Sequence, residues 1–167
     1  VTIGPNGNLA PGETSTSISS IEIEGSVSLA GTCTIDVNKA LPFGHDLVGF
    51  VDHLTFGGTL RMNVIGPALA AGDIFSIFNF TTASGAFAQI EPATPGTGLA
   101  WDVSNLTVDG TVRVVTLLQP SFTETLFTAD GIVMSGANGA PGTPYFVLSS
   151  TNIALPVLNW TRVSTNL

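Results

Sequence analysis

The sequence predicts an all-β protein on three observations. Apolar and polar residues alternate in short runs, as they do in half-buried strands. No window of about twelve residues carries a helical apolar stripe that is free of Gly and Pro. Turn-forming pairs recur along the chain, which contains 19 Gly and 10 Pro in 167 residues. These features are typical of many short strands joined by tight turns.

The strands expected in the first two thirds of the chain differ in their pattern. Residues 21–29 alternate, and Gly25 shifts the phase, which indicates a bulge or turn. Residues 60–64 and 112–114 alternate as well. The run 74–78 is apolar on both faces, which is typical of a central strand. The expected core residues are Ile21, Ile23, Leu60, Val64, Ile74, Phe75, Phe78, Trp101, Val112 and Val114.

A short repeat begins at Gly31, Gly58 and Gly110, in each case with Gly-Thr ahead of an alternating stretch. The starts lie 27 and 52 residues apart, so the second gap is about twice the first. A period of roughly 20–30 residues suits a β-solenoid, in which each coil pairs its backbone with the coils above and below. The alternative is three hairpins of a β-sandwich that each begin with Gly-Thr.

The composition changes after Leu118, where Gln119 and Pro120 end the last solenoid-like strand. We therefore expect a β-solenoid-like domain over residues 1–118 and a small antiparallel β lobe over residues 120–167. Strands are expected in the lobe near residues 122–127, 131–135, 145–148 and 160–163.

Charge and hydropathy exclude several classes of protein. Twelve acidic residues against four basic ones leave a formal charge of −8, which argues against nucleic acids and anionic lipid surfaces as partners. With 44% hydrophobic residues the chain is too apolar to be disordered, yet it holds no apolar run long enough for a membrane-spanning helix. The weakly charged, hydroxyl-rich composition is common in secreted β proteins, so we expect an extracellular or cell-surface location.

His45-Asp46 and Asp52-His53 form the sole cluster of histidines and carboxylates in the sequence. The two histidines lie eight residues apart, so only an intervening turn would let their side chains converge on a metal or a substrate. A polar turn with one hydrogen-bonded histidine is the expectation. The carboxylates Asp102, Asp109 and Asp130 are too scattered in sequence to predict a calcium site.

An enzymatic function is not expected. A glycosidase needs two carboxylates about 5–10 Å apart. The pair to consider is Asp36 with Glu22 or Glu24, on the hypothesis that they face one sheet surface. The four basic residues are dispersed, and neither a phosphate-binding glycine loop nor a nucleophile elbow is present. We expect no catalytic residue, no cofactor and no metal. Cys33 has no second cysteine to pair with and is expected in the core.

Three aromatic residues, Trp101, Tyr145 and Trp160, are the candidates for binding carbohydrate, since sugars pack on exposed aromatic rings flanked by polar groups. The alternative is structural. Trp101 follows Leu99 and Ala100 and is expected to fill the core, and Trp160 follows a Pro-bounded turn and is expected to anchor the lobe.

An ordered series of segments resembles a known family. The series is NLAPG at 8–12, SLAGT at 28–32, DLV at 46–48, LTFGGTL at 54–60, IGPALAAGD at 65–73, GLAWD at 98–102 and VDGTV at 108–112. It resembles the C-terminal part of large secreted proteins with autotransporter-associated β-strand repeats from Verrucomicrobia and Planctomycetes. The segments SSTN, LP and NWT between residues 149 and 161 resemble the lobe that often follows.

The resemblance implies an all-β fold with a short right-handed β-solenoid-like stack followed by a small antiparallel β lobe. It also implies a bacterial surface or adhesive structure without catalytic residues. Proteins of this kind stack many coils ahead of this region and extend the lobe further. The present chain starts at the final coils and stops at Leu167, so we expect unpaired strand edges.

Another copy of the chain is the simplest cover for such edges, by coil-on-coil stacking or by strand donation. A head-to-tail contact that does not close builds a filament. The leading hypothesis is an extracellular structural subunit that self-associates through open β edges into a filament or surface layer. The alternative is a carbohydrate-binding or adhesin module of a larger secreted protein, with polysaccharide as its partner.

Overall fold

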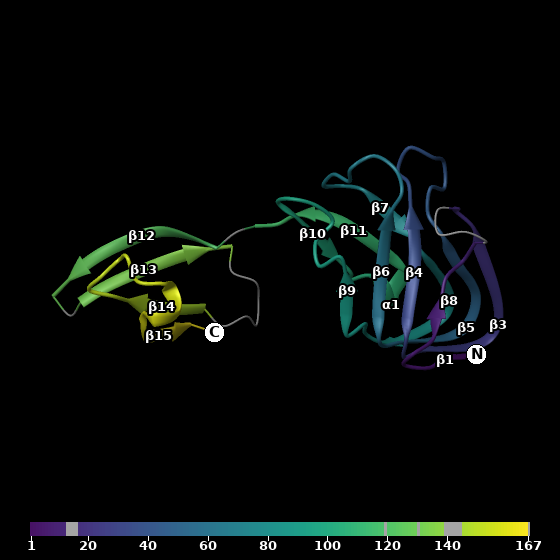
Figure 1. Cartoon of the computed structure of the whole chain (residues 1–167), viewed down its shortest axis with the longest axis horizontal. Coiled ribbons are helices and arrows are strands. Elements are labelled where there is room, and N and C mark those ends of the chain that lie inside the picture. Colours follow the sequence, from purple (N-terminus) through teal and green to yellow (C-terminus); the bar gives the residue numbers. More distant parts are fainter. Residues whose placement is uncertain (13–16, 119, 130, 139–144, 167) are drawn as a thin grey trace. The chain divides into compact units, whose positions relative to one another are not determined.

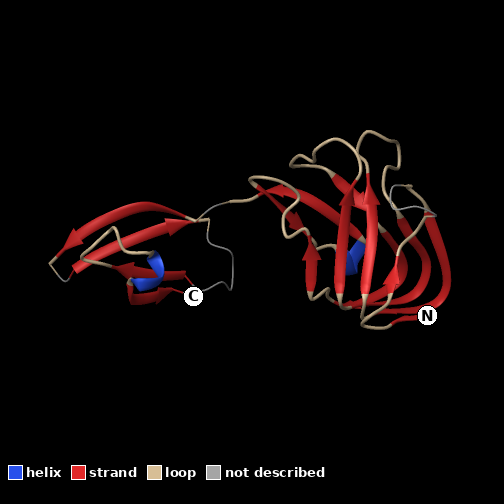
Figure 2. Cartoon of the chain, viewed as in Figure 1, coloured by secondary structure: helices blue, strands red, loops and turns tan. Residues whose placement is uncertain are grey.

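The structure is a computed structural model that describes residues 1–12, 17–118, 120–129, 131–138 and 145–166. The chain divides into two compact units, Val1–Leu117 and Leu118–Leu167. Strands dominate both units, and the helices are limited to short segments (Figures 1 and 2). The expected all-β class is confirmed.

The first unit is built around a parallel β-solenoid of about 3 turns over residues 2–91. One sheet contains β1 (Thr2–Ile3), β3 (Ser20–Leu29), β5 (Leu47–Phe56) and β8 (Phe78–Gly85). The other contains β2 (Asn8–Leu9), β4 (Thr32–Val37), β6 (Thr59–Val64) and β9 (Gln89–Glu91). The chain alternates between the sheets and returns to the first sheet once per turn, at β3, β5 and β8. Figure 1 shows β3, β5 and β8 curving beside one another while β4 and β6 run straight.

The first two members of the Gly-Thr repeat stack on each other, as the repeat predicts. Thr32 of β4 pairs with Thr59 of β6, and the whole of both strands stays in parallel register. The Thr59 N–H donates to the Gly31 carbonyl at 2.9 Å. Gly58 has φ +56°, and a Cβ there would overlap the Gly31 carbonyl oxygen, so this corner requires glycine. The coil period is therefore fixed by backbone contact at the corner.

The core lies between the two sheets. Alternate residues of each strand point inward, so Leu60 contributes from one sheet and Val27, Leu54 and Phe78 from the other. Of the expected core residues, Ile23, Leu60, Phe75, Phe78, Val112 and Val114 are buried, and Ile21, Val64 and Trp101 are partly buried against the same cluster. Cys33 is fully buried, as expected. Gly25 has φ +96° and interrupts the register of β3, which confirms a bulge.

The run 74–78 is not one central strand, and the prediction that Ile74 belongs to the core is wrong. The run is divided between β7 (Ile74–Ser76) and β8, which belong to different sheets and lie at the edge of each. Ile74 is 53% exposed, whereas Phe75 is buried. The chain changes sheet at Ile77, whose N–H donates to the distant Gly110 carbonyl at 3.1 Å. This contact decides the strand break, and no local pattern reveals it.

A three-stranded antiparallel sheet combines β7 with two strands that follow the solenoid in sequence. Its order is β10 (Leu99–Asp102), β11 (Thr111–Thr116) and β7, and the one-turn helix α1 (Leu106–Asp109) precedes β11. The third Gly-Thr repeat, at Gly110, opens β11 and thus an antiparallel strand, unlike the two repeats in the solenoid. Leu106 of α1 is buried, and α1 packs against β8.

The second unit contains two antiparallel hairpins, as the small β lobe predicts. The first pairs β12 (Ser121–Thr128) with β13 (Gly131–Ala137). The other pairs β14 (Tyr145–Ser149) with β15 (Thr161–Asn166), and the short 3-10 helix η1 (Val157–Asn159) lies between them in sequence. Neither α1 nor η1, the helices in the described part of the chain, has the length and apolar character to cross a membrane.

Candidate functional site

The outer face of the β2-β4-β6-β9 sheet carries polar residues in register with one another. Thr34 of β4 lies opposite Arg61 of β6, and Arg61 lies opposite Glu91 of β9. The Arg61 guanidinium contacts the Glu91 carboxylate, with Nη2 to Oε2 at 2.9 Å. The Thr34 hydroxyl donates to Asn8 Oδ1 at 3.0 Å. These residues line a hollow of about 660 Å³, but they satisfy one another, as a structural side-chain ladder does.

Asp36 and Asp46 are buried beside this hollow. Both Asp46 oxygens accept backbone N–H groups, Oδ1 from Ser19 at 2.8 Å and Oδ2 from Asp36 at 2.9 Å. Asp36 Oδ1 accepts from the Asn63 side-chain amide at 2.8 Å. Burial raises the pKa of the Asp46 carboxyl, against the lowering effect of the two backbone hydrogen bonds. The carboxylate of Asp46 holds three backbone segments together.

The structure does not bring together the two carboxylates that the sequence offers for a glycosidase, Asp36 with Glu22 or Glu24. Asp36 lies on β4, whereas both glutamates lie on β3 of the other sheet and are exposed. The carboxylate beside Asp36 is instead Asp46, which bonds to its backbone. The sequence interpretation had placed Asp46 in a polar turn.

The two histidines have separate surroundings. His45 Nδ1 lies 3.1 Å from the Asp46 carbonyl oxygen, and its ring meets Phe75 edge-on at 6.3 Å between centroids. His53 lies on β5, with ring nitrogens 2.8 Å from the Thr82 hydroxyl and 3.1 Å from that of Ser84.

Among the described residues no group of three His, Cys, Asp or Glu side chains is placed to hold a metal ion. Asp130 of the scattered calcium candidates lies outside those residues.

The three aromatic candidates for sugar binding belong to different units. Trp101 lies on β10 in the first unit, packs against the core and donates its indole N–H to the Pro92 carbonyl at 2.9 Å. Trp160 donates its indole N–H to the Leu155 carbonyl at 2.9 Å. Tyr145 pairs with Asn166 at the end of the β14-β15 ladder opposite to that near Trp160, and its side chain lies outside the described residues.

Sequence reasoning missed two exposed aromatic residues. Phe43 and Phe50 have φ of 53° and 62°, in a region that bulky residues rarely adopt. Phe43 is 89% exposed and borders a hollow of about 380 Å³, where the Lys39 ammonium meets the Asp73 carboxylate at 3.2 Å. The signals were an aromatic residue between Pro42 and Gly44, and an interrupted alternation at Phe50.

One edge of the solenoid carries an unpaired stretch of strand. β1 pairs with β3 only at Ser28 and Leu29, and the N-terminal ammonium donates to the Ser26 carbonyl. Within the described ranges, no strand pairs with the outer edge of β3 from Ser20 to Gly25. Glu22 and Glu24 are exposed along this stretch, and charged side chains of this kind limit unregulated pairing of edge strands.

The opposite end of the solenoid is partly covered by the chain itself. The Gly110 carbonyl accepts the N–H groups of Ile77 and Phe78 at 3.1 and 3.2 Å. Gly110 has φ +73°, and a Cβ there would overlap the Phe78 carbonyl oxygen, so only glycine allows this approach. Because α1 also packs on β8, the two ends of the solenoid differ in how much strand edge they expose.

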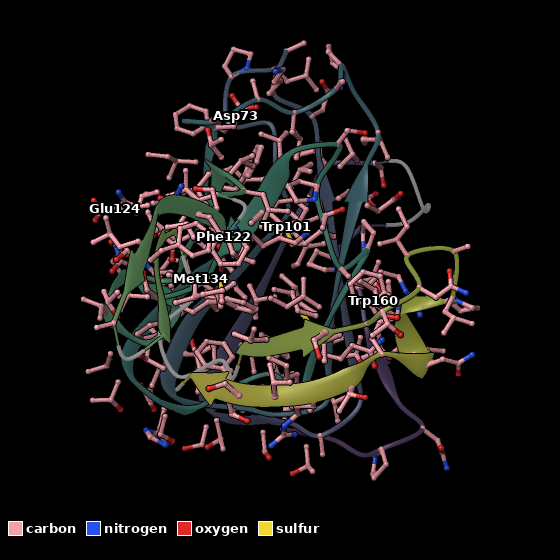
Figure 3. The ribbon with its side chains drawn as sticks, turned by 90° about the vertical axis from the view of Figure 1, so that its left-hand side faces the viewer. Asp73, Trp101, Phe122, Glu124, Met134 and Trp160 are labelled. Carbon is pink, nitrogen blue, oxygen red and sulfur yellow. The ribbon has the colours of Figure 1, made fainter. Side chains whose placement is uncertain are left out.

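The second unit has no buried side chain among its described residues. Each hairpin consists of two strands, so each strand has one outer edge without a described strand partner. Figure 3 shows Phe122 and Glu124 on β12, and Met134 on β13. In the other hairpin the Arg162 guanidinium lies over the Phe146 ring at 4.3 Å. Isolated two-stranded hairpins are marginally stable in water, so a further packing surface would stabilise each hairpin.

Comparison of the chain with known protein families, with curated proteins and with solved structures finds no match. The geometry of the described residues and the sequence pattern are therefore the basis for a functional proposal.

Proposed function

We propose that this protein is an extracellular structural subunit that self-associates through open β edges into a filament or surface layer. The observation that carries the proposal is the outer edge of β3, which has no described strand partner from Ser20 to Gly25. An exposed row of backbone N–H and C=O groups is a template for a strand from another molecule.

The difference between the solenoid ends favours strand donation over coil-on-coil stacking. Stacking of two solenoids requires an open edge at both ends, whereas Gly110 and α1 occupy part of the β8 end. Each hairpin of the second unit has outer strand edges that could pair with the open edge of β3 in another copy. A contact between the β3 edge of one copy and a hairpin strand of the next is heterologous, and such contacts propagate when they do not close into a ring.

Composition and resemblance support the extracellular location. The low charged fraction, 10%, is common in secreted β proteins. It also favours association, because little charge must be desolvated when two surfaces meet. The resemblance to secreted proteins with autotransporter-associated β-strand repeats points to a bacterial cell surface and to a mechanical role without catalysis.

The second candidate is a carbohydrate-binding or adhesin module, with polysaccharide as its ligand. The observation that favours it is the exposed Phe43 ring beside the Lys39–Asp73 ion pair, since an aromatic face flanked by polar groups suits a sugar. A Phe43→Ala variant that binds a set of polysaccharides as well as the wild-type chain would exclude this site.

A proline at Glu22 tests the edge. The Ser19 carbonyl accepts from Leu47 of β5, so alternation directs the N–H of Glu22 to the outer edge. Glu22→Pro removes an outer donor and leaves the ladder to β5 intact. The matched control, Glu22→Gln, removes the same charge and keeps the N–H.

Size-exclusion chromatography with light scattering, followed by electron microscopy, reads out the association. We expect wild-type chain and Glu22→Gln to form larger assemblies with rising concentration and Glu22→Pro to lose this open-ended growth. A wild-type chain that stays monomeric throughout, or a Glu22→Pro variant that assembles like Glu22→Gln, would overturn the edge proposal. Circular dichroism of the three proteins shows whether the fold is retained.

A further inference from the structure

The first hairpin of the second unit presents one apolar face. Phe127 pairs with Ile132, and two residues further along β13 is Met134, so the three side chains lie on the same face. The register shifts between Phe122 and Glu124. This bulge places Phe122, which pairs with Gly136, on the face of Phe127, although residues five positions apart in a regular strand point to opposite faces. We name Phe122, Phe127, Ile132 and Met134 the hairpin face.

The hairpin face is largely exposed and large enough for an interface. Phe122 and Phe127 are 73% and 82% exposed, and Ile132 and Met134 are exposed as well. Because an aromatic side chain buries roughly 150–250 Å², the four residues present on the order of 500 Å² of apolar surface. Two such faces together reach the total of about 1,000 Å² at which specific protein–protein interfaces begin.

The opposite face of the same hairpin is more polar. Leu126 pairs with Val133 there, between the Glu124–Ser135 pair and the Thr128–Gly131 pair. The bulge thus concentrates the large apolar side chains on one side. A hairpin with one apolar face gains stability when a second sheet covers that face.

The distribution of charge favours a second copy as the cover. Ten of the twelve acidic residues and three of the four basic ones lie in Val1–Leu117, which leaves −7 on the first unit and −1 on the second. Two copies that meet through the second unit bring nearly neutral surfaces together, whereas a contact between two first units opposes −7 with −7. The hairpin face itself carries no charged side chain.

We infer that two copies of this chain meet through the hairpin face, with the β12-β13 sheets stacked face to face. The inference rests on the proposed self-association and names its surface and symmetry. The same patch serves on both copies, which makes the contact isologous. A two-fold contact here and an edge contact at β3 link copies into an open series.

Paired serine variants test which face is used. The double variant Phe122→Ser/Phe127→Ser removes both aromatic rings from the hairpin face. Its dimer should have a dissociation constant at least about tenfold higher than that of the wild-type chain, the usual effect of removing aromatic side chains that dominate an interface. The matched control, Leu126→Ser/Val133→Ser, changes the opposite face of the same hairpin and keeps the wild-type constant. Equal weakening of both variants, or no weakening of the first, would overturn the inference. Sedimentation equilibrium measures the constants.

Single cysteines provide a second readout, which reports the proximity of the two copies at a chosen position. Under mild oxidation, Ile132→Cys forms a disulfide-linked dimer because the same face of two copies meets, whereas Val133→Cys stays largely monomeric. The native Cys33 is fully buried and does not compete. Equal cross-linking at both positions contradicts a face-to-face contact.

The failure of this inference is distinguishable from failure of the proposed function. A wild-type chain that is monomeric at every concentration removes both. Assembly that is lost in Glu22→Pro and unchanged in Phe122→Ser/Phe127→Ser leaves the proposed function and removes the hairpin contact. Reduction of the larger assemblies to a dimer in Glu22→Pro, together with weakening of that dimer in the face variant, supports both contacts. Assembly that is the same in Glu22→Pro and Glu22→Gln but weakens in the face variant supports the hairpin contact and removes the edge contact.

Discussion

Asp46 and Asp36 are joined twice, because the Asp46 carboxylate accepts the Asp36 N–H at 2.9 Å and the Asp46 N–H donates to the Asp36 carbonyl at 2.9 Å. The second carboxylate oxygen accepts the N–H of Ser19, which lies 27 residues before Asp46. A side chain therefore completes hydrogen bonds between coils at a place where no strand does so. Asp46 is only 1% exposed, so water cannot replace these bonds.

Asp46→Asn should destabilise the first unit. Both oxygens of a carboxyl group keep lone pairs that can accept an N–H whether or not the group is protonated, whereas the NH₂ group of an amide cannot accept and opposes a backbone N–H. We expect the free energy of unfolding to fall by about 1–3 kcal/mol, the cost of one buried donor left without a partner. Asp52→Asn on β5 is the control, because Asp52 is exposed and such changes stay within about 0.5 kcal/mol. Urea denaturation followed by fluorescence measures both.

The loss of unfolding free energy in Asp46→Asn, called the deficit below, should depend on pH. Burial raises the pKa of Asp46 above its ordinary value of 3.8 in the folded chain. The folded chain then binds this proton more tightly than the unfolded chain, so the stabilising contribution of Asp46 is full below the ordinary pKa and is lost as the pH rises through the raised value. Urea titrations from about pH 3.5 to about pH 7 should show a deficit that shrinks with rising pH. A deficit that grows instead would mean that the two backbone hydrogen bonds outweigh burial.

Cys33 should be unreactive in the folded protein. Burial, with a smaller contribution from the Asp46 charge, raises the pKa of its thiol to about 12. Since the thiolate is the reactive form, a thiol reagent at about pH 8 should modify no cysteine in the native chain and one per chain in urea. Rapid modification without urea would show that the first unit opens at this position.

Gly110→Ala tests whether the approach of Gly110 to Phe78 closes the end of the solenoid. The control is Gly25→Ala, at a positive φ with open space around the added Cβ. Both variants carry the backbone strain of about 1–2 kcal/mol for a left-handed residue. Gly110→Ala should lose a further roughly 1–3 kcal/mol, because its Cβ overlaps the Phe78 carbonyl oxygen. Thermal unfolding of the two variants should separate them; equal midpoints would mean that the end relaxes freely.

The solenoid was predictable because its coils repeat. The 27-residue spacing of Gly31 and Gly58 follows from the stacking of equal coils, and the same spacing separates Ser19 from Asp46 and Asp36 from Asn63. A search for polar residues one coil apart would therefore have found the side-chain ladder. The orientation of Trp101 was less accessible, since its indole N–H bonds to a carbonyl in a loop. The hairpin face escaped sequence reasoning because a bulge at residue 123 changes the phase of β12.

The break within residues 74–78 marks the limit of sequence patterns. Ile74 and Phe78 look equivalent in an apolar run, yet Ile74 is exposed and Phe78 is 2% exposed, with its ring 5.1 Å from that of Phe56. Phe78→Ala should cost about 3–5 kcal/mol through lost burial and a cavity. Ile74→Ala should change stability by about 0.5 kcal/mol or less, as surface substitutions do. Chemical denaturation of the two single variants measures the contrast, and similar losses in both would show that Ile74 is covered in solution, by another copy or by a different strand arrangement.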